Sequence, residues 1–410
     1  MRSTPSSLHL SAAPTGSGSD IAARRLRQAL RESGARADWL SPRQCCGGDA
    51  PERSADPLFW SRSAELSRLL GRAVDRLDRR RTGVHLSITP GLRAAALRRW
   101  PVDLLHLHWL GTGFLSLFSL QRLQKPLVWT LHDLWPLLGV LPYPPSAAGG
   151  SGPSSALGFN LDPLAIALKQ RCLPPGLQFI APSAWAARVA QQTAVMAALP
   201  LERPIAVIPN AVDALFFQGI ATAEPNLGPR RPLLLFGGSN AFSDPRKGWA
   251  LLQPLLPWLR HSFPQWRLAS FGELPPAGLN LPQPWEHHGR IRDPHQLAAL
   301  YRSADLLVMP SQQETFGQVA AEAQACGLPV VALADSGVAA VVEHRISGFL
   351  MRASSCEALR EGLAYFLDHP ERLPGAAAAA AQQAWRHFHP HVVAEQHLHL
   401  YRQLVPGPGF

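Results

Sequence analysis

Lysine is scarce in this chain of 410 residues, and regularly spaced cysteines and long apolar runs are missing. The apolar run near the N-terminus is too short for a secretory signal, and none reaches the roughly 18 residues of a membrane span. Five cysteines without regular spacing favour reduced thiols over a disulfide framework or a zinc site. Together these absences predict a cytoplasmic protein that does not cross a membrane.

Acidic residues are few as well, and the formal net charge is +10. Residues 1–100 hold most of the excess, with 18 arginines, no lysine and 9 acidic residues. This region suits an anionic ligand or peripheral contact with an anionic membrane, on which a basic amphipathic helix predicted over 62–81 would lie. The alternative is a solvated face with that helix packed on its own domain. No helix-turn-helix, zinc-finger or RNP-type pattern accompanies the charge, which argues against nucleic acid as a partner.

Apolar sequence is plentiful: hydrophobic residues make up 46% of the chain and charged residues 17%, which excludes a disordered protein. Apolar runs of strand length alternate with helical segments in two series. This predicts an α/β protein with two doubly wound, Rossmann-like domains on parallel sheets. The runs lie at 8–13, 103–109, 126–132, 177–183 and 205–210, then at 231–238, 266–272, 304–311 and 328–334. A stretch with Gly, Pro and Asn, 216–231, reads as the linker between the series.

Ligands of open parallel sheets bind beyond the carboxyl ends of the strands, so residues that directly follow strands are the candidates. After the first run, PTGSGSD brings Gly16 and Gly18 to a helix start, where a backbone can approach an anion closely. The pattern is not GxGxxG, and no acidic residue ends the second predicted strand, 35–40, to hold a ribose. A nicotinamide-dependent enzyme is therefore disfavoured.

Three further residues follow strands or open a helix. His132 ends the run 126–132 and is placed to donate to a substrate oxygen or to orient it; the alternative is a histidine satisfied within its own loop. Arg246 and Lys247 start a helix after the run 231–238. Two cations are unfavourable beside the positive end of a helix dipole unless an anion such as a diphosphate binds; the alternative is a solvated pair.

Two glutamates follow the run 304–311: Glu314 lies in a loop, and Glu322 lies about two turns into a helix. Eight residues at about 1.5 Å each span up to roughly 12 Å, comparable to the reach from a hexose across a diphosphate to a ribose. Carboxylates accept hydrogen bonds from the vicinal hydroxyls of both sugars. Backbone N–H groups of Thr315, Phe316 and Gly317 would hold the phosphates between them. The spacing thus predicts a grip on both ends of a nucleotide sugar.

These motifs together resemble a known family. ETFGQVAAE at 314–322, followed by ACGLPVV, looks like the E-x7-E signature of retaining family 4 glycosyltransferases of the GT-B fold. The stretch 102–135 resembles bacterial polysaccharide-biosynthesis members, and IAPSAW, VIPNAVD and DPRKG match in order and spacing. The segment 287–311 resembles the lead-in to the signature, and 388–404 resembles a helix that crosses back to the first domain. The likeness covers nearly the whole chain except 41–100.

The resemblance implies an acceptor-side domain in 1–217, a nucleotide-sugar-binding domain in 218–388 and the crossing helix in 389–410. It implies transfer of a hexose from a nucleoside diphosphate sugar to a hydroxyl of a glycan or lipid-linked acceptor. Configuration at the anomeric carbon would be retained, and no metal or other cofactor would be required. Consistently, the sequence has no Asp-x-Asp, which the metal-dependent alternative fold uses to hold a cation.

The resemblance also assigns roles to the candidate residues. Glu314 and His132 would contact the donor hexose, and Glu322 would bind the ribose. Arg246 and Lys247 would neutralise the leaving diphosphate. The loop from Gly16 to Gly18 would approach the phosphates or the acceptor, and Ile291, within Arg-Ile-Arg, would approach the base through its backbone.

The chain departs from the family pattern at three places. After His132, relatives continue into Thr-Gly-Gly-Cys-His-Tyr, whereas this chain reads PLLGVLPYPPSAAGGSGPSS, so acceptor contacts are not predicted. Ala211 replaces a usual glycine, and the first loop reads GSGS instead of a glycine pair. Two alternatives stay open: a nucleotide-sugar epimerase on the same fold, and a non-catalytic sugar-nucleotide-binding protein. A pyridoxal-phosphate phosphorylase fits poorly with so few lysines.

Overall fold

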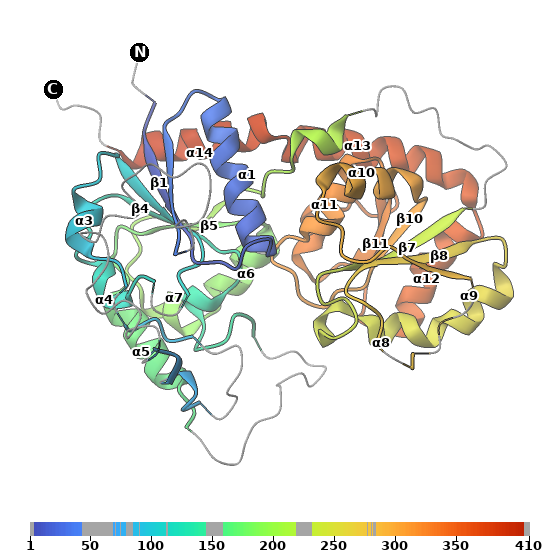
Figure 1. The fold of residues 1–410 in the computed structure, drawn as a ribbon, viewed down its shortest axis with the longest axis horizontal. Coiled ribbons are helices and arrows are strands. Elements are labelled where there is room, and N and C mark those ends of the chain that lie inside the picture. Colours follow the sequence, from blue (N-terminus) through green and yellow to red (C-terminus); the bar gives the residue numbers. More distant parts are fainter. Residues whose placement is uncertain are drawn as a thin grey trace. The chain divides into compact units, whose positions relative to one another are not determined.

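The computed structural model divides the chain into two compact units. The described residues are 4–42, 69, 71–73, 75–78, 85–89, 91–111, 114–144, 159–218, 232–276, 278–279, 281 and 284–405. Unit 1 comprises Met1–Ile208 together with Val393–Phe410, and unit 2 comprises Pro209–Val392. Figure 1 shows the fold of both units and labels most of their helices and several of their strands.

Unit 1 is built on a parallel six-stranded sheet in the order β2-β1-β3-β4-β5-β6. Its strands are β1 (Ser7–Leu10), β2 (Ala37–Leu40), β3 (Leu104–Leu107), β4 (Leu127–Thr130), β5 (Gln178–Ala181) and β6 (Ala206–Val207). All residues of β1, β3, β4 and β5 are buried, as expected for strands covered on both faces. Because β2 and β3 flank β1, the direction of winding reverses between β1 and β3, where such sheets bind ligands.

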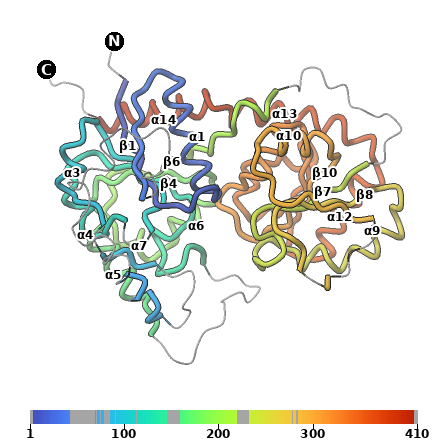
Figure 2. The backbone as a smooth tube through the Cα atoms, in the orientation of Figure 1, coloured from blue at the N-terminus to red at the C-terminus, as the bar shows by residue number. Residues whose placement is uncertain are grey.

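The helices of unit 1 begin at residues that cap them. Ser17, Ser183 and Thr193 accept hydrogen bonds from the backbone N–H groups of the first turns of α1, α6 and α7. The described helices of unit 1 include α1 (Gly18–Glu32), α3 (Ala94–Arg98), α4 (Leu117–Leu120), α5 (Asp162–Cys172), α6 (Ala184–Gln191) and α7 (Ala194–Ala198). The C-terminal α14 (Pro390–Leu404), red in Figure 2, belongs to unit 1 from Val393 on.

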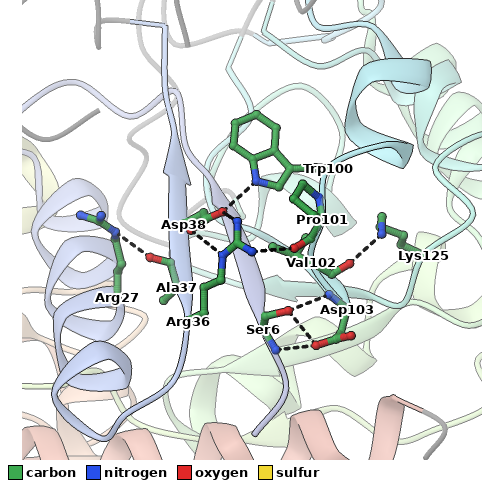
Figure 3. Close-up of polar contacts among 10 residues, drawn as sticks. All are labelled: Ser6, Arg27, Arg36, Ala37, Asp38, Trp100, Pro101, Val102, Asp103 and Lys125. Carbon is green, nitrogen blue, oxygen red and sulfur yellow. Dashed lines mark hydrogen bonds and ion pairs between the residues drawn. The ribbon is translucent and has the colours of Figure 1, made fainter. Parts of the chain in front are cut away.

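Polar contacts tie together the amino-terminal ends of β1, β2 and β3 (Figure 3). The Asp38 carboxylate accepts hydrogen bonds from Arg36 and from the Trp100 indole, both at 2.8 Å. Asp103 accepts from the backbone N–H and the hydroxyl of Ser6, both at 2.7 Å, and the backbone bond lowers the pKa of the Asp103 carboxyl. This edge of the sheet is therefore fastened by structural contacts, whereas ligands are expected at the opposite, carboxyl edge.

Unit 2 carries a second parallel six-stranded sheet, in the order β12-β11-β10-β7-β8-β9. Its strands are β7 (Leu233–Gly238), β8 (Arg267–Gly272), β9 (Trp285–His287), β10 (Leu306–Met309), β11 (Val330–Leu333) and β12 (Gly348–Met351). The first strand, β7, lies between β8 and β10. The winding therefore reverses between β7 and β10, and the loops after these two strands define the expected binding edge.

Alternate residues of these strands enter two separate hydrophobic clusters, one on each face of the sheet. Leu235 and Leu307 pack with α10 and α11, whereas Leu234 and Leu306 pack with α8, α9 and α12. The helices are α8 (Trp249–Leu252), α9 (Leu256–Ser262), α10 (Pro294–Ser303), α11 (Gln318–Ala325), α12 (Cys356–Leu367) and α13 (Leu373–Phe388). The alanine run 376–381 lies in α13, as its helix propensity predicts.

The contacts divide the chain after Ile208 and after Val392, whereas the sequence placed the boundaries at 217/218 and 388/389. The short 3-10 helix Ala214–Phe217 packs into unit 2 through Phe216, which accounts for the earlier first division. Residues 219–231 of the predicted linker and most of the predicted basic helix at 62–81 lie outside the described residues. Within the described ranges, no helix has both the length and the hydropathy that crossing a bilayer requires.

Candidate active site

The turn after β7 lies directly against the loop after β10. The 3-10 helix Pro245–Lys247 ends at Gly248, whose backbone φ of 76° favours glycine. A Cβ added to Gly248 would stand 2.1 Å from the carbonyl oxygen of Pro310, so only glycine permits this approach. The backbone N–H of Gln312 also donates to the carbonyl of Arg246 at 2.7 Å. The residues that follow the two central strands are thereby brought together.

Lys247 and Glu314 form an ion pair across this junction. The Lys247 Nζ lies 2.6 Å from Glu314 Oε1, and the two side chains are 29% and 14% exposed. A charge-assisted hydrogen bond between partly buried groups fixes both side chains more firmly than a surface pair would. The structure therefore joins two residues that the sequence proposed separately, 67 positions apart.

Arg246 has a different carboxylate partner. Its guanidinium bonds to both oxygens of Asp244, at 2.6 and 3.1 Å, and its backbone N–H donates to Asp244 at 3.0 Å. Partial burial would raise the pKa of the Asp244 carboxyl, but the bonds from Arg246 outweigh it and lower that pKa. Because protein carboxylates already hold Arg246 and Lys247, the pair does not by itself require an external anion. Binding of a diphosphate by these two residues stays a prediction.

The loop from Glu314 to Gly317 leads into α11, and its side chains are mostly structural. Phe316 is 1% exposed and packs edge-on against Phe388 of α13 at 5.3 Å. Gly317 has φ 92°, and an added Cβ would stand 2.7 Å from Val338. The Glu314 carbonyl accepts from the Gly337 N–H at 2.8 Å, and Thr315 is buried. The backbone path of this loop is therefore closely determined.

Glu322 lies inside α11, as predicted, and its side chain is only 4% exposed. The hydroxyl of Tyr301, a residue of α10 with no exposed surface, donates to Glu322 Oε2 at 3.4 Å. Ile291 lies in the segment after β9 and packs partly against the core of unit 2. Ile291 is on the carboxyl side of the sheet of unit 2, because it follows β9. The predicted contacts of Glu322 with ribose and of Ile291 with the base stay predictions.

In unit 1, Gly16 lies in the loop between β1 and α1, and Gly18 is the first residue of α1. Gly16 has φ 77°, and its N–H donates to the carboxylate of Asp20 at 3.0 Å. Asp20 also binds Arg24 at 2.9 Å, so an acidic side chain of the protein occupies the first turn of α1. An incoming phosphate would have to compete with this carboxylate, and the predicted contact of the loop stays a prediction.

His132 follows β4 and is partly buried. Its Nε2 lies 2.9 Å from Nδ1 of His108. On the other side of the His108 ring, Nε2 of His108 lies 2.9 Å from Nδ1 of His9. His106, beside them, hydrogen bonds to Tyr401 at 2.5 Å and to Thr130 at 2.7 Å. Burial lowers the pKa of His132 to about 4, so the ring is neutral at physiological pH.

Two family models match this chain: "Glycosyltransferase Family 4" over residues 16–214 and "Glycosyl transferases group 1" over residues 246–383. A D-inositol 3-phosphate glycosyltransferase of Segniliparus rotundus is 31% identical over 329 residues, which cover 75% of this chain and 68% of that protein. The chain belongs to the group 1 glycosyltransferases. The predicted family is thus confirmed at the level of group 1 and of the family 4 domain.

This glycosyltransferase also resembles solved structures along almost its whole length. Sucrose-phosphate synthase from Thermosynechococcus elongatus matches with a TM-score of 0.65 at 22% identity, covering 98% of this chain and 99% of that one. Anabaena Alr3699/HepE in complex with UDP-glucose matches with a TM-score of 0.62 at 18% identity, covering 98% and 100%. At these identities the likeness shows the fold, and the predicted GT-B architecture is confirmed. The alternatives of an epimerase or a non-catalytic binder gain no support.

Sequence reasoning missed several residues that organise the site of the glycosyltransferase. Lys169 of α5 has no exposed surface and donates to the carbonyls of Trp135, Leu138 and Gly139, in the loop that follows His132. Its Nζ also lies 4.3 Å from the centroid of the Trp135 ring, and burial lowers the pKa of the amine to about 7. A lysine in the last turn of a helix carries no sequence signal of such burial. The histidines of HLHW at 106–109 were visible, because alternate residues of a strand share one face.

Proposed function

We propose that this glycosyltransferase moves a hexose from a nucleoside diphosphate sugar to a hydroxyl of a glycan or lipid-linked acceptor, retaining the anomeric configuration without a metal ion. The observation that carries the proposal is the Lys247–Glu314 ion pair at the reversal point between β7 and β10. The pair places an ammonium that can bind an anion beside a carboxylate that can accept hydrogen bonds from sugar hydroxyls. Both lie at the edge where open α/β sheets bind ligands.

The leaving group determines the role of the cations. A nucleoside diphosphate gains negative charge as the bond to the anomeric carbon breaks, so positive charge fixed in advance lowers the barrier. An ammonium has three N–H donors, and the bond to Glu314 uses one at Lys247. The guanidinium of Arg246, oriented by Asp244, adds a second cation in the same turn. Neither side chain would need to reorganise far when the charge develops.

The two glutamates would hold the sugars at the ends of the donor. Glu314 Oε1 bonds to Lys247, and its carboxylate would accept from hydroxyls of the hexose. Glu322, oriented by Tyr301, would accept from the ribose, with the backbone of Thr315, Phe316 and Gly317 along the phosphates. Unit 1 would contribute His132 to the hexose. Gly16 and Gly18 would approach the phosphates or the acceptor, and Ile291 would approach the base.

The donor and the cellular setting are proposed from a structural neighbour and from the charge of the chain. UDP-glucose is the first donor to test, because a solved structure with the same fold was determined with it. Lipid-linked acceptors would be met at the inner face of the membrane, and the arginine excess of residues 1–100 suits peripheral contact with anionic lipid there. The expected setting is therefore cytoplasmic, in polysaccharide biosynthesis.

The test is donor turnover by variants of the ion pair. With UDP-glucose and a panel of glycan and lipid-linked acceptors, UDP release should depend on the acceptor, and the product should keep the donor's anomeric configuration. Glu314→Gln and Lys247→Ala should each lower kcat/KM about 100-fold, because charge stabilisation in the transition state is lost. Glu286→Gln is the matched control, since Glu286 pairs with Arg267 at 3.0 Å at the other end of β8. Turnover within twofold of the unaltered protein for either ion-pair variant would contradict the proposal.

A further inference from the structure

A chain of hydrogen bonds leads from the interior of unit 1 to His132. The Ser7 hydroxyl lies 3.1 Å from Nε2 of His9, and Nδ1 of His9 lies 2.9 Å from Nε2 of His108. Nδ1 of His108 then lies 2.9 Å from Nε2 of His132. Ser7, His9 and His108 are 1%, 0% and 3% exposed, whereas His132 is partly exposed. The chain therefore has one end in the core and the other at the surface.

The strand register creates this chain. Parallel pairing sets His9 of β1 opposite His106 of β3, and His108 follows two residues later on the same face. The ring of His108 lies nearly parallel to those of His9 and His132, at interplanar angles of 15° and 25° and centroid distances of 5.2 and 5.1 Å. Residues from β1 and from the ends of β3 and β4 thus form one row across the carboxyl edge of the sheet.

Proton counting links the states of the three rings. A neutral imidazole has one N–H and one lone pair, so each ring in the row donates at one nitrogen and accepts at the other. If His108 carries its proton on Nδ1, it donates to His132 and accepts from His9, and both neighbours must also carry theirs on Nδ1. If His108 carries it on Nε2, both neighbours must carry theirs on Nε2. The three rings therefore share one tautomer.

The same cluster offers a candidate metal site, but its bonds favour the row. Ring nitrogens of His9, His106 and His108 lie within 4.8 Å of one another. Each nitrogen of His106, however, already has a partner in Tyr401 or Thr130, and its ring is stacked on that of His108 at 4.3 Å. Stacked rings do not aim their lone pairs at one point, which coordination of a metal ion requires.

We infer that Ser7, His9 and His108 are positioning residues that fix the ring orientation and the tautomer of His132. When the three rings carry their protons on Nδ1, His132 presents an N–H donor at Nδ1. When they carry them on Nε2, His132 presents an acceptor at Nδ1. This inference rests on the proposed contact of His132 with the donor hexose. The row fixes the orientation and tautomer of His132 before the sugar binds, so less conformational entropy is lost on binding.

The tautomers can be measured without substrate. Ring nitrogen chemical shifts in protein labelled at histidine, assigned by single substitutions, should show His9, His108 and His132 in one common tautomer. Two different tautomers among the three rings would overturn the inference. So would one tightly bound metal ion per purified chain, because a nitrogen that ligates a metal cannot share a proton with a neighbouring ring.

Two variants of His108 separate positioning from packing. In His108→Asn the amide replaces Nδ1 and keeps a partner for His132, whereas in His108→Gln it replaces Nε2 and keeps a partner only for His9. Both lose one bond of the row, so their stabilities should be similar. His108→Gln should lower kcat about five- to tenfold more than His108→Asn, which is the effect of one hydrogen bond. His106→Gln is the control: this equally buried ring is outside the row, and the tautomer of His132 and kcat should be unchanged within twofold.

The outcomes distinguish the inference from the function on which it depends. If kcat follows stability alone, with both His108 variants equally impaired, the positioning role is wrong. If the His108 variants change the tautomer of His132 but no variant of the row, His132→Ala included, changes turnover, the row exists and the proposed contact of His132 with the hexose is wrong.

Discussion

At the scale of single residues, the site of unit 2 depends on polar groups that are held by a few directed contacts. Glu322 is 4% exposed, and the Tyr301 hydroxyl reaches it across the interface between α10 and α11. A buried carboxylate is tolerated only while hydrogen bonds replace those that it made to water. The orientation of Glu322 therefore depends on a residue 21 positions away as well as on its own helix.

Replacement of Tyr301 tests this dependence. Tyr301→Phe removes one hydroxyl from the core and should lower the free energy of unfolding by about 1 kcal/mol. If Glu322 binds the donor ribose, the Kd for UDP-glucose should also rise about fivefold, measured by calorimetry. Tyr365→Phe is the matched control, because the Tyr365 hydroxyl donates to the Arg345 carbonyl at 3.5 Å on the exposed side of α12. A loss of stability in Tyr301→Phe with unchanged donor affinity would show that the Tyr301 hydroxyl does not orient Glu322 for donor binding.

At the scale of elements, the sequence predicted the central strands of both sheets and the edge strands β2 and β6 of unit 1, but it missed the edge strands of unit 2. Runs such as 231–238 and 304–311 have apolar centres because β7 and β10 are buried on both faces, and they were found within two residues of their observed ends. The edge strands β9 and β12 were missed. β9 has three residues, all partly exposed, and so lacks an apolar run. A short edge strand forms because an adjacent strand supplies its backbone hydrogen-bond partners. Which strands are adjacent is a property of the tertiary structure.

The contact of α5 with the loop after His132 supplies a prediction at this scale. Lys169→Met keeps the volume of the side chain but removes the ammonium from three backbone carbonyls in 135–139. The free energy of unfolding should fall by about 3 kcal/mol, because each buried acceptor that loses its partner costs about 1 kcal/mol or more. Lys125→Met should cost less than about 1 kcal/mol, since Lys125 donates to the single carbonyl of Val102. Equal losses in urea titrations would contradict this account of the loop.

At the scale of the whole molecule, the sequence revealed two parallel sheets and the residues at their carboxyl edges. It did not reveal which of those residues touch. Lys247 and Glu314 follow different strands, and His9 meets His108 across 99 positions, so their contacts follow from strand order and register. A period of two shows that His106 and His108 share a face, but only the sheet shows what that face meets. The sequence alone therefore could not predict which residues of distant strands come into contact.

The buried histidines also make the stability of unit 1 depend on pH. Burial lowers the pKa of His9 to about 3 and the pKa values of His132 and His397 to about 4, and it lowers those of His106 and His108 as well. Neighbouring histidines further lower the pKa values of His9, His106, His108 and His132, and Arg27 adds to the effect at His9. An unfolded chain takes up these protons near the ordinary pKa of 6.5.

Unit 1 should therefore lose stability as the pH falls from about 6.5 to about 4. In this range the unfolded chain binds protons that the native unit excludes, so the free energy of unfolding decreases by about 1.4 kcal/mol per pH unit for each such histidine. Hydrogen exchange followed by peptide mass spectrometry at pH 7.5 and 5.5, corrected for intrinsic rates, should show protection falling mainly in the strands of unit 1. His106→Gln should reduce the slope by about one proton. Equal loss of protection in unit 2 would contradict a cause located in the histidine cluster.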